Sequence, residues 1–195
     1  GCTPITRANP GYPVALRKRL GLEAPGCLWA KGNLDILSMP SVSLVGSRAL
    51  KERNRRFARE VGIQAAKQGF ALISGNARGA DSAAQDACLE AGGYVVSVLA
   101  DSLNEYCPDA HRLYLSEDDY DECFSVLRAL HRNRVIHALS DGVFVAQCTL
   151  ERGGTWDGSV QNLRKSWSNL YCFRDGSPAA DALEQMGAFL IDEKM

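Results

Sequence analysis

The chain has 195 residues, of which 46% are hydrophobic and 23% are charged, as expected of a globular protein with one substantial core. A formal net charge of -1 excludes a strongly basic surface over the whole protein, so any polyanion would have to bind at a local cationic patch. No apolar run is long enough for a membrane-spanning helix, and no basic segment precedes an apolar one as in a secretion signal. We therefore expect one main domain and no membrane association.

The seven cysteines are odd in number, scattered, and never spaced as C-x-x-C. This usage is typical of reduced, structural thiols in a cytoplasmic protein and argues against a zinc site. His131 and His137 lie far from other ligand types in the sequence, so we interpret them as core or surface residues. No metal and no cofactor are expected.

Residues 1–40 are rich in proline and glycine, which predicts a loop-rich lead-in. Within it we expect a short helix at residues 14–20 and an edge strand at residues 28–30. The lead-in is too small for a domain and should pack on the main sheet, while residues 41–195 form the main domain. Because the sequence starts without a methionine, we also expect that an earlier module is missing.

From residue 42 onward, apolar runs alternate with helical periodicity. Strands are predicted at 42–45, 70–73, 94–99, 142–146 and 170–173, with weaker candidates at 113–115 and 188–191. Three helical apolar stripes lie between them, at 57–66, 83–91 and 124–138. Continuous apolar strands indicate burial on both faces, as in a parallel sheet covered by helices. The predicted fold is α/β, a single Rossmann-like, doubly wound domain with a mostly parallel sheet, whose ligands bind beyond the carboxyl ends of the strands.

Residues 41–48 form a short apolar strand that stops at Gly46-Ser47-Arg48 and is followed by a helical pattern. Unpaired N–H groups at the start of a helix attract anions, and Arg48 would add a fixed positive charge. We therefore predict an anion site at this turn. The basic residues at 53–59 are predicted to form the solvated face of the helix.

Two later loops have similar chemistry. The second strand ends at Ser74-Gly75 and is followed by Arg78, and its glycines let the backbone approach a ligand closely. We predict Asp81 as the N-cap of the next helix rather than as a catalytic acid. Gly153-Gly154-Thr155 at the start of a later helix repeats the anion-site pattern.

A basic cluster occupies residues 131–134 of another predicted helix. Nearby side chains on a helix point in different directions, so Arg132 and Arg134 are not both expected to face one site. We predict Arg134 as the inward residue and Arg132 as its less certain partner. The acidic run at 117–122 is predicted to form a mostly solvated turn before this helix.

Together these motifs resemble the DprA/Smf family of DNA-processing proteins. The matching elements are Val45-Gly46-Ser47-Arg48, Ser74-Gly75, Ala77-Arg78-Gly79 with Asp81, Arg132-Asn133-Arg134 with Ile136, Leu139-Ser140-Asp141, and Gly153-Gly154-Thr155-Trp156. Tyr12-Pro13 and residues 29–34 precede the first strand at the usual distance. The Gly-Gly-Thr-Trp loop and residues 100–103 resemble a DprA-like branch of the LOG/SLOG-type Rossmann superfamily.

The resemblance implies a non-catalytic, homodimeric protein that binds single-stranded DNA and, in DNA uptake and transformation, passes the strand to a RecA-type recombinase. Carried over by position, Arg48 and Arg134 would contact phosphates, and Ser74 and Gly75 would line the pocket floor. The predicted phosphate-binding residues are Gly46, Ser47, Arg48, Ser74, Gly75, Arg78, Arg132, Arg134, Gly153, Gly154 and Thr155. Binding through phosphates would be independent of sequence and sensitive to salt.

The chain also departs from the family. An acidic, helical stretch at 117–131 replaces the usual proline- and phenylalanine-containing segment, which puts base stacking in doubt. One alternative is a LOG-like phosphoribohydrolase acting on nucleoside 5′-monophosphates, although that family's glutamate is missing and Asp157 is the nearest carboxylate. The other alternative is a non-catalytic nucleotide sensor, which the slightly acidic overall charge favours.

Overall fold

The apolar runs of the sequence form one mixed sheet, which contains nine strands in residues 1–193, the part of the chain that the computed structural model describes. The strands are β1 Thr3–Thr6, β2 Cys27–Gly32, β3 Ser41–Val45, β4 Ala71–Ser74, β5 Tyr94–Val98, β6 Arg112–Ser116, β7 Gly142–Val145, β8 Asn169–Phe173 and β9 Phe189–Ile191. Their order across the sheet is β1-β2-β6-β5-β4-β3-β7-β8-β9. From β6 to β9 neighbouring strands run parallel, as predicted, whereas β1 and β2 are antiparallel additions.

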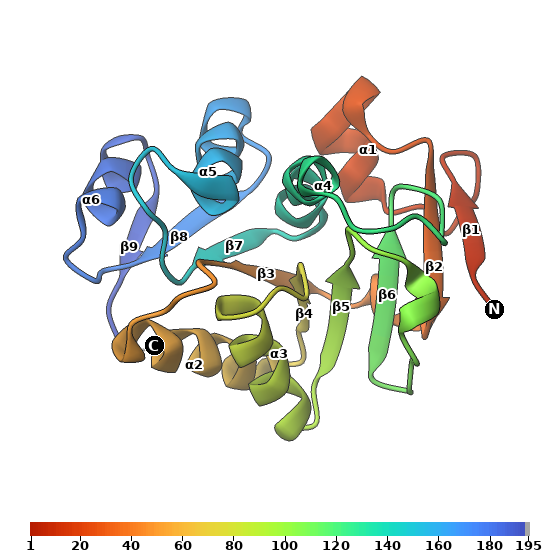
Figure 1. Ribbon diagram of the computed structural model, residues 1–195, viewed down its shortest axis with the longest axis horizontal. Helices are drawn as coiled ribbons and strands as arrows, with labels where there is room; N and C mark the ends of the chain where they lie inside the picture. Colours follow the sequence, from red (N-terminus) through yellow and green to blue (C-terminus); the bar gives the residue numbers. More distant parts are fainter. Residues whose placement is uncertain (194–195) are drawn as a thin grey trace.

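Helices cover both faces of the sheet (Figure 1). The α-helices in the described residues are α1 Val14–Leu20, α2 Glu52–Gln68, α3 Ala80–Glu90, α4 Val126–Leu139, α5 Gly153–Lys165 and α6 Pro178–Gln185. On one face, α2 and α3 pack over a core that includes Phe57 and Leu72. On the other, α1, α4, α5 and α6 cover a second core that includes Leu16 and Val145. Burial on both faces explains why the central strands are continuously apolar.

The chain reverses its direction across the sheet between β3 and β7. It moves from β3 through β4 and β5 to β6, returns with β7 on the other side of β3, and continues outward to β8 and β9. Val45 and Val145 are register partners at the carboxyl ends of these two strands. This arrangement confirms the predicted doubly wound fold, and its switch point is where loops 46–51 and 146–152 leave the sheet side by side.

The lead-in is more ordered than its composition indicates. The predicted helix is present as α1, but residues 28–30 belong to an inner strand, because β1 lies outside β2 at the edge of the sheet. Alternate residues of β2, Leu28 and Ala30, are buried, so the strand has the pattern of a sheet with one covered face. The prediction of an edge strand at 28–30 is therefore wrong, and the lead-in extends the main sheet.

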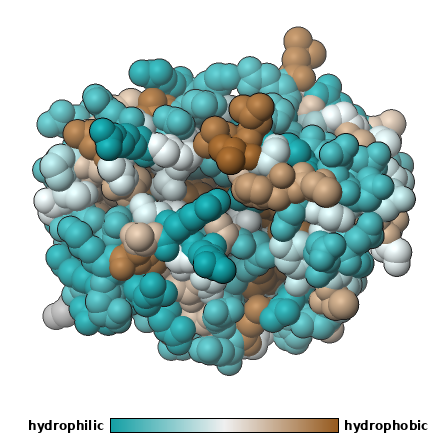
Figure 2. Space-filling model, in the orientation of Figure 1, coloured by the Kyte–Doolittle hydropathy of each residue, from teal (hydrophilic) through white to brown (hydrophobic). Residues whose placement is uncertain are grey.

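The third predicted apolar stripe is only half correct. Val135 and Ala138 of α4 are buried, but Phe124 and Leu127 are 52% and 79% exposed. The first turns of α4 lie beside a cleft at the strand ends rather than over the sheet, so nothing covers them. Figure 2 shows apolar side chains gathered at the surface where Figure 1 places α4.

No helix within residues 1–193 combines the length and the apolar composition needed to cross a lipid bilayer.

Candidate functional site

A cleft of about 880 Å³ opens at the switch point, beyond the carboxyl ends of β3 and β7. Its lining comes from loop 46–51, the loop between β4 and α3, the first turns of α4, and the start of α5. Of the predicted binding residues, seven line it: Gly46, Ser47, Arg48, Arg132, Gly153, Gly154 and Thr155. The other four lie elsewhere, for reasons given below.

The turn at Gly46-Ser47-Arg48 is built differently from the predicted helix N-terminus. Helix α2 begins only at Glu52, so the turn does not present the first N–H groups of that helix. The Ser47 N–H and hydroxyl both donate to the Gln147 carbonyl oxygen, at 2.9 and 3.1 Å. Arg48 is exposed and its guanidinium has no hydrogen bond or ion pair within residues 1–193. Of this turn, therefore, the Ser47 donors are used within the protein, whereas the Arg48 side chain is available to an anion.

Gln147, which follows β7, holds this turn in place. Its carbonyl oxygen accepts both hydrogen bonds from Ser47. Its side-chain oxygen accepts a hydrogen bond from the Lys51 N–H at 3.0 Å, and its side-chain NH₂ donates one to the Ala49 carbonyl at 3.1 Å. Residues 47–51 are thus fixed along their length by one side chain and one carbonyl. The sequence offered no signal for Gln147, because its role depends on β7 lying next to β3.

The helix N-terminus predicted at Gly153-Gly154-Thr155 is present at the start of α5. The first three residues of this helix, Gly153, Gly154 and Thr155, line the cleft, and no side chain caps their N–H groups. Within the described part of the chain these N–H groups have no acceptor, so they face the cleft at the positive end of the helix dipole. Arg152, the N-cap residue, is exposed and also lines the cleft, and it was missed because it precedes the glycine pair.

The structure reverses the predicted roles of the two arginines of α4. Arg132 lies in the cleft wall, 93% buried, whereas Arg134 is directed away from it. Arg134 forms a 2.7 Å ion pair with Glu117, whose side chain is only 5% exposed, and donates to the carbonyl of Glu23 at 3.0 Å. The prediction that Arg134 faces the cleft is therefore wrong. Its side chain instead connects α4 to the lead-in at Glu23 and to the acidic turn at Glu117.

The predicted residues of the β4–α3 loop support the cleft more than they line it. Ser74 is fully buried and accepts a 2.5 Å hydrogen bond from Gln85. Gly75 lies beneath Arg132, since a Cβ at this position would be 2.6 Å from the Arg132 Cζ. Arg78 is exposed on the loop but lies outside the cleft lining.

Another part of the lining is apolar. It consists of Phe124, just before α4, and of Val126, Ala129 and Leu130 in the first turns of α4, and Phe124, Val126 and Leu130 are all more than 40% exposed. The segment that seemed to lack a base-stacking residue therefore places an exposed aromatic ring at the rim of the cleft.

Two buried titratable groups belong to the cleft floor. Burial raises the pKa of Asp81 to about 6, against the opposing effects of Arg132, two backbone N–H groups and Arg48. The prediction that Asp81 caps α3 is wrong, because its carboxylate accepts hydrogen bonds from two N–H groups of the preceding loop. Burial lowers the pKa of His137 to about 4, and its Nδ1 has no hydrogen-bond partner. His137 is thus the predicted core histidine, and His131 is exposed.

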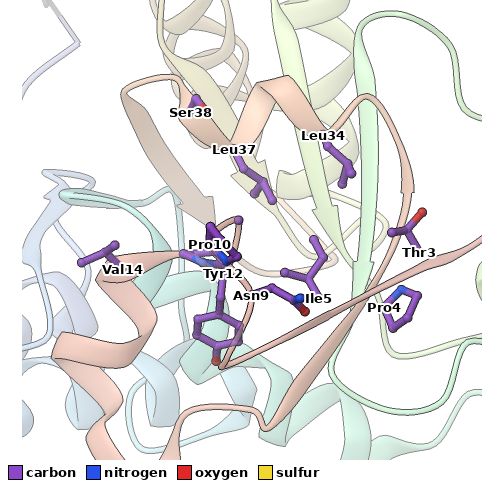
Figure 3. Close-up of a pocket in the computed structure, with 12 residues that line it drawn as sticks. Thr3, Pro4, Ile5, Asn9, Pro10, Tyr12, Val14, Leu34, Leu37 and Ser38 are labelled. Carbon is purple, nitrogen blue, oxygen red and sulfur yellow. The ribbon is translucent and has the colours of Figure 1, made fainter.

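A second cleft, of about 470 Å³, lies in the lead-in between β1, the loop before α1 and residues 34–38 (Figure 3). Figure 3 shows aliphatic and proline side chains such as Ile5, Pro10 and Leu37 around it. None of its lining residues is charged, so it offers no cationic side chain to a phosphate.

The fold and the larger cleft define a class: a Rossmann-like protein with a cleft at its switch point whose lining combines arginines with apolar side chains. Within residues 1–193, no cluster of three or more His, Cys, Asp or Glu side chains could hold a metal ion. The family model described as DNA recombination-mediator protein A matches residues 3–162. The chain therefore belongs to this family, which confirms the resemblance to DprA/Smf proteins.

Individual relatives agree with this assignment. DNA processing protein DprA of Streptococcus pneumoniae is 35% identical over 182 residues, covering 87% of this chain and 64% of the relative. The X-ray structure of the pneumococcal DprA matches with a TM-score of 0.84 and 30% identity, covering 97% of this chain and 70% of that one. Helicobacter pylori DprA, described by its single-stranded DNA binding mode, matches in fold with a TM-score of 0.79 and 22% identity, covering 97% and 90%. The chain thus spans less than two thirds of its pneumococcal relative.

Proposed function

We propose that the chain binds single-stranded DNA in the switch-point cleft and acts in DNA processing or recombination. The observation that carries the proposal is the combination of two unlike groups of residues in the lining of one cleft. Arg48, Arg152 and the free N–H groups of α5 line the same cleft as Phe124 and its apolar neighbours. Single-stranded DNA has the matching chemistry, because its phosphates attract cations while its unpaired bases can lie against apolar or aromatic side chains.

Two further observations support the proposal. The chain belongs to the DNA recombination-mediator protein A family, and its structural relative from Helicobacter pylori is described as binding single-stranded DNA. The overall charge of -1 is compatible with this ligand because two exposed arginines without an ion pair in the described residues, Arg48 and Arg152, line one cleft. We also propose a homodimer and a RecA-type recombinase as partner, on the basis of the family resemblance alone.

We propose that the cleft binds without catalysis. Two carboxylates line it, Asp81 and Asp157. Asp81 is buried and accepts hydrogen bonds from the loop before α3, and Asp157 is exposed with no partner that would tune it as an acid or base in the described residues. A hydrolase that cleaves a glycosidic bond would need an acid or base positioned against its substrate.

A mononucleotide remains the second candidate ligand because of the size of the cleft. Its volume of about 880 Å³ lies in the range of small-molecule sites. Such a ligand would gain nothing from additional nucleotides, which separates it from DNA.

The site assignment is tested by the salt dependence of binding. Fluorescence anisotropy with a labelled oligonucleotide of about 20 residues should show that Arg48→Ala weakens binding and lowers the slope of log K against log salt by about 0.7, the contribution of one phosphate contact in a single strand. The matched control is Arg164→Ala, since Arg164 is also exposed but lies in the last turn of α5, away from the cleft. Equal affinity and slope in both variants would contradict the assignment.

A further inference from the structure

One peptide group at the cleft floor is held from both sides by charged side chains. The Gly75 N–H donates to Asp81 Oδ2 at 2.9 Å, and the Gly75 carbonyl accepts from Arg132 Nη1 at 2.8 Å. The same Asp81 oxygen accepts the Ala77 N–H at 3.2 Å, and Arg132 Nη1 also donates to the Val98 carbonyl. Both residues are buried, with 6% of Asp81 and 7% of Arg132 accessible to solvent.

The pinned loop in turn supports the turn that carries Arg48. The Ala80 N–H donates to the Ser47 carbonyl at 3.2 Å. A Cβ at Gly79 would lie 2.3 Å from the Arg48 carbonyl oxygen, so the two backbones are in direct contact. Asp81 directly follows Ala80, whose N–H makes this hydrogen bond to Ser47. Asp81 is therefore adjacent in the chain to the contact that supports the Ser47-Arg48 turn.

Arg132 also has a side that is not used by the protein. Its Nε donates to Asn133 and its Nη1 to two carbonyls, but Nη2 has no partner in residues 1–193 and is not among the buried unpaired atoms. Because Arg132 lines the cleft, Nη2, which lies next to Gly75, is a donor that the protein leaves free at the cleft floor. The orientation of that edge depends on the carbonyl contacts that Nη1 makes.

We propose that Asp81 is a positioning residue, which fixes the Gly75–Ala77 backbone and thereby sets both the Arg132 edge and the Arg48 turn for binding. This inference rests on the proposed function of the cleft. The groups that face Asp81 are Arg132 from α4, Arg48 from the loop after β3, and the N–H groups of Gly75 and Ala77. What Asp81 supplies is a hydrogen-bond acceptor, since one of its oxygens makes both loop contacts.

If Asp81 acts as a hydrogen-bond acceptor, its replacement by alanine and its replacement by asparagine should have different effects on binding. Asp81→Ala removes the acceptor and leaves two loop N–H groups without it, so oligonucleotide affinity should fall about tenfold, the effect of losing one net hydrogen bond. Asp81→Asn keeps an oxygen at the same place without the charge and should recover most of that loss. Since neither change removes a phosphate contact, the salt slope should stay at the wild-type value, unlike that of Arg48→Ala. Asp86→Ala, at an exposed position of the same helix, is the control.

The experiment measures affinity for a labelled oligonucleotide of about 20 residues at several salt concentrations, below the melting temperature of each variant. Gly75→Ala is included because its methyl group would displace the Arg132 guanidinium without altering Asp81, so it decides the question if Asp81→Ala does not fold. We expect weaker binding with an unchanged salt slope in Asp81→Ala and Gly75→Ala, and recovery in Asp81→Asn. Wild-type affinity in both weakened variants, or no recovery in Asp81→Asn, would overturn the positioning role alone. Failure of the wild type to bind would overturn the proposed function as well.

Discussion

At the scale of single residues, Arg132 and Arg134 show how two nearby arginines on one helix serve different purposes. Arg132 is held against the Gly75 and Val98 carbonyls in the cleft wall. Arg134 pairs with the buried carboxylate of Glu117 outside the cleft. A buried ion pair contributes little net stability, but removing one partner leaves an uncompensated buried charge.

We therefore predict that Arg134→Ala lowers the free energy of unfolding by about 3 kcal/mol, because the buried Glu117 side chain would lose its ion-pair partner. Urea denaturation of the variant and the wild type measures this difference. Replacing both partners, as in Glu117→Leu with Arg134→Met, should restore much of the loss, since no buried charge is left. A loss below about 0.5 kcal/mol in Arg134→Ala, as is usual for surface positions, would contradict the structural role.

The pKa of His137 predicts a second effect at this scale. In the folded protein burial lowers the pKa to about 4, so between pH 6.5 and 4 the unfolded chain binds a proton that the folded protein does not. Stability should consequently fall with decreasing pH in this window, by up to about 1.4 kcal/mol per pH unit. Asp81 acts in the opposite direction, because its raised pKa adds stability as the pH falls below about 6.

Comparison with His137→Leu isolates the histidine from Asp81. The stability difference between His137→Leu and the wild type should shift in favour of the variant as the pH falls from 7 to 4.5, measured by chemical denaturation at each pH. A difference that does not change with pH would contradict the buried, neutral histidine.

At the scale of elements, the start of α4 combines positions that a helical pattern alone would place in the core. Phe124, Val126 and Leu130 line the cleft, while Leu127 is 79% exposed and outside the lining. The free end of one helix thus supplies the apolar wall of the cleft.

We predict that Phe124→Ala weakens oligonucleotide binding by about 1–3 kcal/mol, the range measured for base–aromatic stacking. The salt slope should not change, because no phosphate contact is lost. Leu127→Ala is the matched control, a more exposed apolar residue of the same segment that does not line the cleft. Anisotropy titrations in which both variants bind equally would remove Phe124 from the site.

The elements also show what the sequence could predict. Strands β3 to β9 follow from continuous apolar runs, and the glycine pair that begins α5 correctly indicated a helix N-terminus at the cleft. Local pattern did not reveal which arginine of α4 faces the cleft, because that depends on Gly75 leaving room for one guanidinium. Gln147 escaped notice for a similar reason, since its role is set by a strand neighbour distant in the sequence, and Arg152 escaped notice because it precedes the glycine pair.

At the scale of the whole molecule, the reversal between β3 and β7 brings loops separated by about a hundred residues to one edge of the sheet. Cations come from the loops after β3 and β7, donors from α5, and apolar groups from α4. A net charge of -1 is therefore compatible with the proposed polyanion ligand, because Arg48 and Arg152 lie where the fold places its ligands.

The central claim is that this cleft holds an extended single strand rather than one nucleotide. The most direct measurement is the affinity of the wild-type protein for a length series from a mononucleotide to an oligonucleotide of about 20 residues, with a duplex of equal length and analysis of products. Affinity should rise steeply with length, the duplex should bind more weakly because its bases are stacked and paired, and no free base should be released. Binding of the mononucleotide as tight as that of the longest strand, or release of a base, would contradict the account.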